Sequence, residues 1–330
     1  MPPIAVALGD PAGVGPEIVG KAWAARAVHG LRPFFAVGEV GALRAVWSGP
    51  VRTIDTPAEA DAVFDDALPL LAIGDGAIPT PGSPDVDGAR AALRALEVAT
   101  GLTRSRAAGA LVTAPVSKAE LYRIGFTHPG QTEFVAERCG VSADNTVMML
   151  AGPGLRVVPM TTHLPLAEVP AALSIPLIVA QARVTARALA RSFGVAQPRL
   201  AFAGLNPHAG EGGALGREEI ELIAPAIAQL RDEGIDATGP FAADTMFHPR
   251  ARAKYDVAMC AYHDQALVPL KTLFFDDGVN TTLGLPIIRT SPDHGTAFGI
   301  AGRGVAEPGA MIAAIRMAAD AAERLAAANR

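Results

Sequence analysis

The chain has 330 residues, a length typical of two domains or of one large α/β unit. Half of the residues are hydrophobic and 18% are charged, which excludes intrinsic disorder, and a net charge of −5 without a basic patch argues against a nucleic-acid partner. The only two cysteines, Cys139 and Cys260, lie far apart in apolar surroundings, which favours a reduced cytoplasmic protein over a disulfide scaffold.

Short apolar segments alternate with longer amphipathic ones from the N-terminus onward, a pattern typical of an α/β fold whose helices flank a parallel or mixed sheet. The N-terminus lacks the basic residues of a signal peptide. The longest uncharged stretch, 169–182, contains two prolines and is too short for a membrane span of about 20 residues. We expect strands at 4–8, 33–37, 68–73, 109–113, 146–151, 155–160, 199–205, 256–262 and 285–289. We expect helices at 87–105, 131–139, 174–192, 216–233 and 309–328.

Three of the seven histidines follow directly after a predicted strand: His163, His208 and His263. Ligands in open α/β sheets bind beyond the carboxyl ends of the strands, so these imidazoles can converge if their strands share one sheet. Neutral imidazole suits zinc and other first-row divalent ions, and Asp244 or Asp264 could add an oxygen ligand. The alternative is that each is an ordinary loop histidine.

Polar residues gather in the last third of the chain, where Lys271, Asn280 and Arg289 lie among few other charges. Arg289 is expected at the end of strand 285–289, and such a set suits an anionic substrate. Gln131 and Thr132 begin a predicted helix and could bind a phosphate there or only start the helix. The segment after Arg289, with His294 and Gly295, could hold an adenosine or only shape a loop.

Segment 9–17, GDPAGVGPE, links the first predicted strand to a helix. It has neither the order of glycines of a dinucleotide fingerprint nor the Lys-Ser/Thr of a P-loop. The segment is therefore either a tight strand-to-helix turn or a backbone nest for an anion.

Taken together, these motifs identify a family. GDPAGVGPEI, LVTAPVSK, GQTEF, TTHLPL, LNPHAGEGG, GREE, GPFAADTMF, YDVAMCAYHDQALVPLK and VNTTLGLPIIRTSPDHGTAFGIAG follow one another between residues 9 and 302. In this order they resemble the 4-hydroxythreonine-4-phosphate dehydrogenases of the pyridoxine pathway.

The resemblance implies a two-domain α/β fold like that of the isocitrate and isopropylmalate dehydrogenases, with the active site in the cleft between the domains of a homodimer. It implies a first domain of approximately residues 1–130 and 285–330, and a second of approximately 131–284 that carries the dimer interface.

The resemblance also implies which residues bind and react. His163, His208 and His263 would hold a divalent metal such as zinc, magnesium or cobalt. Gln131, Thr132, Lys271, Asn280 and Arg289 would contact the substrate, a small phosphorylated hydroxy amino acid, and Lys271 is a candidate base. Asp244 would reach the site from the partner subunit. NAD or NADP would lie along Asp293, His294, Gly295 and Gly302.

Two positions depart from the family pattern. Gln131 stands where the family usually has His, and an amide can donate a hydrogen bond but cannot shuttle a proton. Gly299 stands where the family usually has Asp, which leaves the choice of NAD or NADP open.

The reaction implied is oxidation of 4-phosphooxy-L-threonine at C3, followed by loss of CO2 to give 3-amino-2-oxopropyl phosphate. Alternatives are a dehydrogenase of threonate or erythronate 4-phosphate or of a ring cis-diol, a zinc aldolase or hydrolase, and a non-catalytic metal-binding protein.

Overall fold

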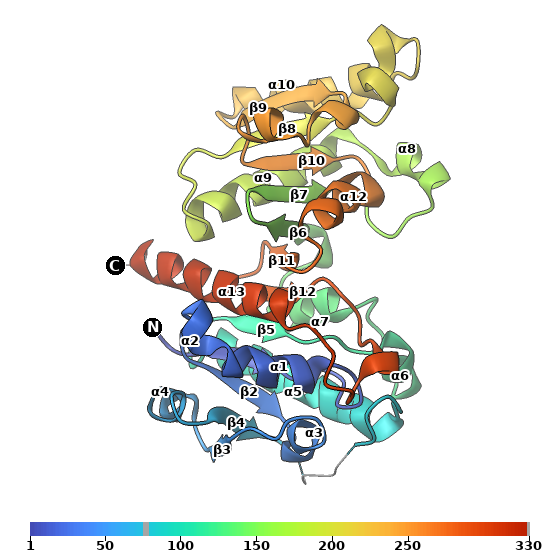
Figure 1. Ribbon diagram of the computed structural model, residues 1–330. Coiled ribbons are helices and arrows are strands. Elements are labelled where there is room, and N and C mark those ends of the chain that lie inside the picture. Colours follow the sequence, from blue (N-terminus) through green and yellow to red (C-terminus); the bar gives the residue numbers. More distant parts are fainter. Residues whose placement is uncertain (75–78, 329–330) are drawn as a thin grey trace. The chain divides into compact units, whose positions relative to one another are not determined.

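The computed structural model describes residues 1–74 and 79–328, and these residues form two compact units. Unit 1 contains Met1–Ala143 and Leu285–Arg330, and unit 2 contains Asp144–Gly284. The first boundary lies beyond the expected residue 130, because Phe134 and Val135 of helix α7 (Gln131–Arg138) pack into the core of unit 1. The ribbon of each unit is drawn in Figure 1.

Unit 1 is built on a sheet with the strand order β3-β4-β2-β1-β5-β12, in which these neighbouring strands run parallel. Its strands are β1 (Ile4–Ala7), β2 (Phe34–Gly38), β3 (Val51–Ile54), β4 (Leu68–Ala72), β5 (Leu111–Thr113) and β12 (Arg289–Pro292). Its helices are α1 (Gly15–Ala24), α2 (Arg26–His29), α3 (Val40–Arg44), α4 (Ala60–Val63), α5 (Val86–Arg104), α6 (Lys118–Arg123), α7 and α13 (Gly309–Ala328).

The two faces of the unit 1 sheet are covered by different helices. Leu111 belongs to the core under α5 and α7, whereas Thr290 on the neighbouring strand turns the other way and donates to the carbonyl of Ala314 in α13 at 2.9 Å. Since alternate residues of a strand point to opposite faces, Arg289, which pairs with Leu111, points toward α7. This register decides where the Arg289 guanidinium lies.

Unit 2 has a mixed sheet in the order β11-β6-β7-β10-β8-β9, in which β6 is antiparallel to both its neighbours and the other pairings are parallel. Its strands are β6 (Val147–Gly152), β7 (Leu155–Pro159), β8 (Arg199–Ala203), β9 (Asp236–Phe241), β10 (Val257–Cys260) and β11 (Val279–Leu283). Its helices are α8 (Val169–Ala172), α9 (Ile175–Ser192), α10 (Ala224–Asp232), α11 (Pro249–Arg252) and α12 (His263–Phe274).

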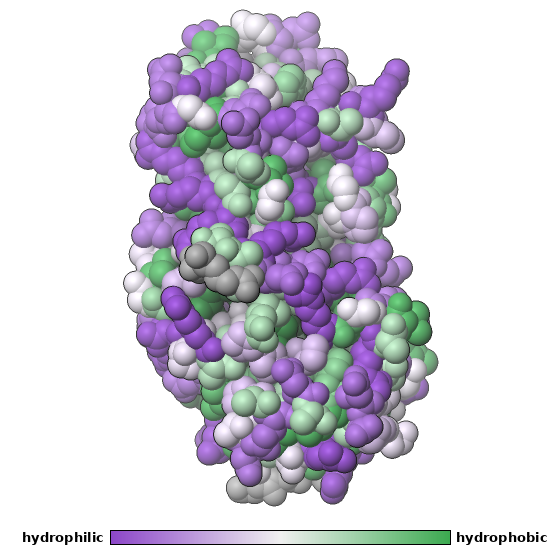
Figure 2. All heavy atoms as spheres, turned by 90° about the vertical axis from the view of Figure 1, so that its left-hand side faces the viewer, coloured by the Kyte–Doolittle hydropathy of each residue, from purple (hydrophilic) through white to green (hydrophobic). Residues whose placement is uncertain are grey.

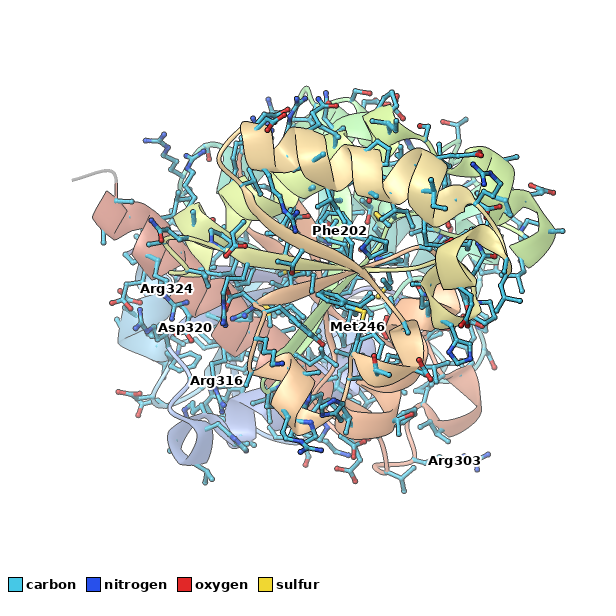
Figure 3. All side chains as sticks on the ribbon, turned by 90° about the horizontal axis from the view of Figure 1, so that it is seen from above. Phe202, Met246, Arg303, Arg316, Asp320 and Arg324 are labelled. Carbon is cyan, nitrogen blue, oxygen red and sulfur yellow. The ribbon has the colours of Figure 1, made fainter. Side chains whose placement is uncertain are left out.

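Helices α9 and α10 pack on one face of this sheet and share one hydrophobic core. Helix α12 packs on the other face over a second core. Phe202 belongs to the first core and Met246 to the second, and Figure 3 shows them on opposite sides of the strands.

In Figure 2 hydrophilic side chains cover most of the visible face, and the apolar ones are scattered in small groups. Among the described residues no single helix is long and apolar enough to cross a membrane; only the pair Leu166–Ala172 and Ile175–Ser192, bent by 90°, passes by length and composition.

The predicted strand at 285–289 is wrong. Leu285 and Ile287 are apolar because they pack on the core of unit 1, but Pro286 has no N–H to donate, and the bonding to β5 begins only at Ile288, whose carbonyl accepts the N–H of Leu111 at 2.9 Å. Arg289 therefore begins a strand rather than ending one. Strands β3, β9 and β11 were not predicted. The helix predicted at 216–233 is divided into a π-helical turn, Glu219–Ile223, and α10.

Candidate functional site

Unit 1 contains a buried cation between two hydroxyl groups, which we call the Arg289 cradle (Arg289, Thr113 and Thr132). Arg289 is 4% exposed, and its guanidinium donates to Thr113 Oγ1 at 2.8 Å and to Thr132 Oγ1 at 3.2 Å. Burial lowers the pKa of Arg289 to about 10, and the Glu133 carboxylate acts in the opposite direction. The group therefore stays cationic at neutral pH and can bind a carboxylate or phosphate with its planar donors.

The N-terminus of α7 adds anion-binding capacity to the cradle. Its first residue is preceded by Gly130, which caps the helix without a side-chain hydrogen bond. Gln131 donates from Nε2 to the carbonyl of Ala114 at 3.3 Å, and its buried Oε1 has no partner within the described part of the chain. Thr132 thus combines a helix N-terminus with a contact to the buried Arg289, an arrangement suited to an anionic ligand.

The predicted nucleotide segment lies on the loop that begins α1. Val14 donates its N–H to the carbonyl of Thr296 at 2.9 Å, and Glu17 accepts the N–H of Ala306 at 3.1 Å. Lys21, paired with Glu17 at 2.8 Å, donates to the carbonyls of Gly304 and Ala306. These contacts attach Thr296, within the segment, and Gly304 and Ala306, just after it, to the start of α1.

Within this segment the predicted residues differ in exposure. Asp293 is half-buried, whereas His294 and Gly295 are exposed, with His294 Nδ1 3.0 Å from the carbonyl of Gly295. Gly302 is exposed, has φ of +73° and packs against Pro81. The sequence did not indicate that Glu17 and Lys21 hold this segment. The feature that could have indicated it is a carboxylate within a largely apolar stretch.

In unit 2, the three predicted metal ligands follow three neighbouring parallel strands. His163 comes after β7, His208 after β8 and His263 after β10, and β10 pairs with both of the others in parallel. The three residues therefore lie beyond the same edge of the sheet. His163 and His208 adopt positive φ angles of 56° and 53°, which are uncommon outside glycine and are enriched at active sites and ligand-binding loops.

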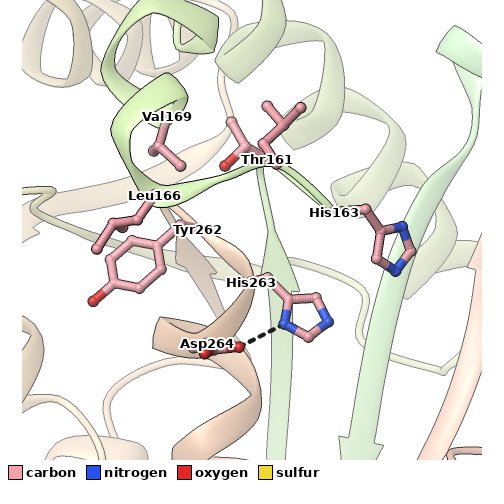
Figure 4. Close-up of a pocket in the computed structure, with 8 residues that line it drawn as sticks. Thr161, His163, Leu166, Val169, Tyr262, His263 and Asp264 are labelled. Carbon is pink, nitrogen blue, oxygen red and sulfur yellow. Dashed lines mark hydrogen bonds and ion pairs between the residues drawn. The ribbon is translucent and has the colours of Figure 1, made fainter.

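Two of the three imidazoles lie close together. The ring centroids of His163 and His263 are 5.6 Å apart with an interplanar angle of 40° (Figure 4). His263 Nδ1 is 2.7 Å from Asp264 Oδ1, and a proton on Nδ1 in this contact would leave Nε2 available to bind a ligand. The imidazole donors fit a first-row divalent ion. In the described ranges, however, no three His, Cys, Asp or Glu side chains are grouped closely enough to hold a metal ion.

A pocket of about 230 Å³ lies beside this pair. It is lined by Thr161, His163, Leu164, Leu166, Val169, Tyr262, His263 and Asp264. In Figure 4 Leu166 and Tyr262 lie together on the side of the pocket away from the His163 ring. The pocket thus joins a polar side with an apolar one.

The remaining predicted residues lie elsewhere in unit 2. Lys271 is partly buried within α12, the helix that His263 begins, and Asp244 is exposed in the short turn Ala243–Thr245. Asn280 lies on β11 opposite Leu150, and its buried Oδ1 has no partner in the described residues. Gln131, Thr132 and Arg289 belong to unit 1, so the predicted site residues are distributed over both units.

The chain was compared with known proteins. The model of the family described as pyridoxal phosphate biosynthetic protein PdxA matches residues 32–318. A 4-hydroxythreonine-4-phosphate dehydrogenase from Zymomonas mobilis is 60% identical over 98% of this chain and 96% of its own length. The crystal structure of the enzyme of that name from Klebsiella pneumoniae has a TM-score of 0.87 and 39% identity, and covers 97% of this chain and 98% of its own.

Two further structures are less similar. A terephthalate 1,2-cis-dihydrodiol dehydrogenase from Burkholderia xenovorans has a TM-score of 0.65 and 30% identity, over 96% of this chain and 97% of its own. An isocitrate dehydrogenase from Methylococcus capsulatus, with a TM-score of 0.50 and 15% identity over 100% of this chain and 88% of its own, shows likeness of fold alone. With the family model and a close relative both matching almost throughout, the chain belongs to the pyridoxal phosphate biosynthetic protein PdxA family.

Proposed function

We propose that this dehydrogenase catalyses the oxidation of 4-phosphooxy-L-threonine to 2-amino-3-oxo-4-phosphooxybutanoate, with NAD or NADP and a divalent ion such as zinc, magnesium or cobalt. The product is a 3-oxo acid, which loses CO2 to give 3-amino-2-oxopropyl phosphate. The enzyme acts as a cytoplasmic homodimer in pyridoxal phosphate biosynthesis. The similarity to the Zymomonas mobilis enzyme supports the reaction class.

The observation that carries the substrate assignment is the Arg289 cradle. A guanidinium that is 4% exposed and bonded to two hydroxyls is a fixed cation, and it matches a doubly acidic substrate. Arg289, Thr132 and Gln131 bind its phosphate or carboxylate, together with the N–H groups that begin α7. Lys271 and Asn280 complete the substrate contacts, and this fixed alignment lowers the entropic part of the barrier.

The ion and the nucleotide supply the chemistry that side chains lack. When bound, the ion would supply Lewis acidity at the C3 oxygen, and the nicotinamide would supply the hydride acceptor for C3. His163, His208 and His263 would hold the ion, and the segment with Asp293, His294, Gly295 and Gly302 would hold the nucleotide. Lys271 is the candidate base and would accept the proton of the C3 hydroxyl only in its neutral amine form. Asp244 would enter the site of the partner subunit, in keeping with its exposed position.

The first experiment is to measure NADH and NADPH formation with 4-phosphooxy-L-threonine, with and without a divalent ion. D-threonate and D-erythronate 4-phosphates and a ring cis-diol are tested beside it, because the amino group distinguishes the proposed substrate from the first two. Ion-dependent turnover of the amino acid supports the proposal. Turnover of only an acid without nitrogen, or of the diol, would replace the substrate and retain the reaction class.

A His208→Ala variant tests the ligand set directly. We expect activity to be abolished and bound metal to fall well below one ion per subunit, because an open catalytic site already leaves one position to the substrate. Full activity in this variant would contradict the ligand set. If no reduced nucleotide forms with any substrate, an aldolase or hydrolase reaction becomes the next candidate, since neither needs a nicotinamide cofactor.

A further inference from the structure

The loop that carries His208 has an unusual backbone. Six consecutive residues, 208 to 213, have positive φ angles between 46° and 100°. Three of them, His208, Ala209 and Glu211, are not glycine, and such residues rarely adopt a left-handed conformation in succession. A conformation of this kind persists only where surrounding contacts hold it. The loop therefore needs a support, and the structure contains one.

The support is the side chain of Glu219, which is 3% exposed beneath the loop. Its Oε1 accepts the backbone N–H of Asn206 at 2.8 Å, and its Oε2 accepts Asn206 Nδ2 at 3.0 Å. Glu219 therefore binds both the main chain and the side chain of Asn206, which lies two residues before the left-handed run. Asn206 Nδ2 also donates to Glu218 at 2.6 Å, so two neighbouring carboxylates hold one amide.

The Glu219 carboxylate also packs against glycines on both sides. A Cβ atom built on Gly210 would lie 2.6 Å from Glu219 Oε2, and one built on Gly204 would lie 3.0 Å from Oε1. Gly204 directly follows strand β8, and Gly210 lies inside the left-handed run. The carboxylate thus lies between the end of the strand and the middle of the loop, where the small size of both glycines admits it.

Local helix geometry accounts for the position of Glu219. It is the first residue of the π-helical turn Glu219–Ile223, and such turns occur frequently at functional sites. Ile220, which the helical period places on the apolar face, is 45% exposed instead, while Glu219 is buried. Glu219 precedes the buried Ile223 and Ile227 by four and eight residues, so it lies on the buried face of this helical segment, under the loop.

We propose that Glu219 is a positioning residue, whose hydrogen bonds to Asn206 fix the left-handed loop so that the His208 imidazole is presented at the carboxyl edge of the unit 2 sheet for binding a divalent ion. The proposal rests on the proposed function, in which His208 is a ligand of that ion. Glu219 does not contact the ion; it acts through the loop. Outer-shell groups of this kind are known to control metal affinity.

The test measures binding of Zn²⁺ and Co²⁺ to the purified full chain by calorimetry, together with the visible absorption of bound Co²⁺. Glu219→Ala is expected to weaken ion binding about tenfold or more and to change the Co²⁺ spectrum. Glu219→Gln keeps an acceptor for the Asn206 N–H and loses the acceptor for Nδ2, so its loss is expected to be smaller. Circular dichroism establishes whether each variant is folded. If Glu219→Ala does not fold, the ion affinity of Glu219→Gln alone tests the proposal.

The matched control is Glu221→Ala. Glu221 lies in the same π-helical turn, is 57% exposed and pairs with Arg217 on the surface at 2.6 Å. This variant is expected to bind both ions as the unsubstituted protein does. Ion affinity unchanged in both Glu219 variants, or lowered equally in Glu221→Ala, would overturn the proposal.

A double-variant cycle separates this inference from the proposed function. If Glu219 acts through His208, adding Glu219→Ala to His208→Ala produces no further loss of ion affinity. An equal loss in both backgrounds would contradict a role through His208. If His208→Ala alone leaves ion affinity unchanged, the ligand set of the proposed function fails, whereas a loss in His208→Ala but in neither Glu219 variant overturns only the present inference.

Discussion

The Arg289 cradle in unit 1 and the histidine edge in unit 2 (His163, His208 and His263) differ in how the fold holds their polar groups. Arg289 is 4% exposed and bonded to hydroxyls on β5 and α7. The histidines are exposed or partly exposed at the ends of strands, and two of them have positive φ angles. Both sets consist of polar side chains, but buried hydrogen bonds hold the first, whereas loop backbone conformation places the second.

The difference follows from the cost of burying charge. A buried guanidinium that lacked partners would be strongly destabilising, so its hydrogen bonds must be part of the folded core. A neutral imidazole on a surface loop has no such requirement, and its direction is set by the backbone and by groups such as Asp264. The cradle is therefore fixed by packing, whereas the histidine edge depends on local support.

The largest effect is expected from removing the buried charge. Arg289→Met should lower kcat/KM about 1,000-fold, because it removes both the cation and the two-point contact with an anionic group. Arg289→Lys keeps the charge without the planar geometry and should recover part of the loss. Steady-state kinetics with 4-phosphooxy-L-threonine measure both. A kcat/KM within tenfold of the original in Arg289→Met would show that the cradle is structural only.

In unit 2 the corresponding change is Asp264→Asn, which weakens the contact that orients the His263 ring. We expect ion affinity to fall about tenfold, with a smaller effect on the stability of the fold because Asp264 is 75% exposed. Asp277→Asn, an exposed substitution on the segment after α12, is the control. Calorimetric titration with Zn²⁺ measures both, and equal affinities in the two variants would remove Asp264 from the histidine edge.

A smaller effect is expected from the hydroxyls of the cradle. Thr113→Val preserves the shape of the side chain but leaves Arg289 without its 2.8 Å contact, which should cost about 1–3 kcal/mol of unfolding free energy. Thr113→Ser restores a hydroxyl and should recover most of the loss. Urea unfolding monitored by circular dichroism gives both values. If valine is as stable as threonine, the core does not require this hydrogen bond.

The smallest effect is expected from Tyr255, an ionisable side chain buried in unit 2. Burial raises the pKa of Tyr255 in unit 2 to about 12, reinforced by Cys260 and opposed by Arg252. Because the folded-state pKa lies above the ordinary value of 10, the stability that the neutral phenol contributes is present below pH 10 and lost as the pH rises toward 12.

Tyr255→Phe tests this assignment. The variant loses the 2.9 Å hydrogen bond to the carbonyl of Met246 and should be about 1 kcal/mol less stable at neutral pH. Its deficit should shrink between pH 10 and 12, since phenylalanine has no proton to release. Urea unfolding at pH 7 and pH 11 measures the change. A deficit that grows at alkaline pH would contradict the assigned direction.

Periodicity and strand ends determined much of this protein from sequence alone. The alternation of apolar and amphipathic segments predicted the α/β class, and helices α5, α9 and α13 lie within one residue of their expected bounds. His163, His208 and His263 were singled out by position after apolar segments, and β7, β8 and β10 are indeed neighbouring parallel strands. Local patterns suffice here because a buried strand must be apolar on both faces.

Contacts between distant segments were decided only by the tertiary structure. Arg289 was placed at the wrong end of a strand, and its partner Thr113 lies 176 positions away, so no local pattern connects them. Glu219 appeared as a first-turn helix residue, but its hydrogen bond from Asn206, 13 positions earlier, shows that it lies under the loop of His208. The periodicity of apolar residues in the sequence indicates which residues are buried. Strand register and long-range hydrogen bonds depend on the whole fold, and they decide which groups each buried polar side chain contacts.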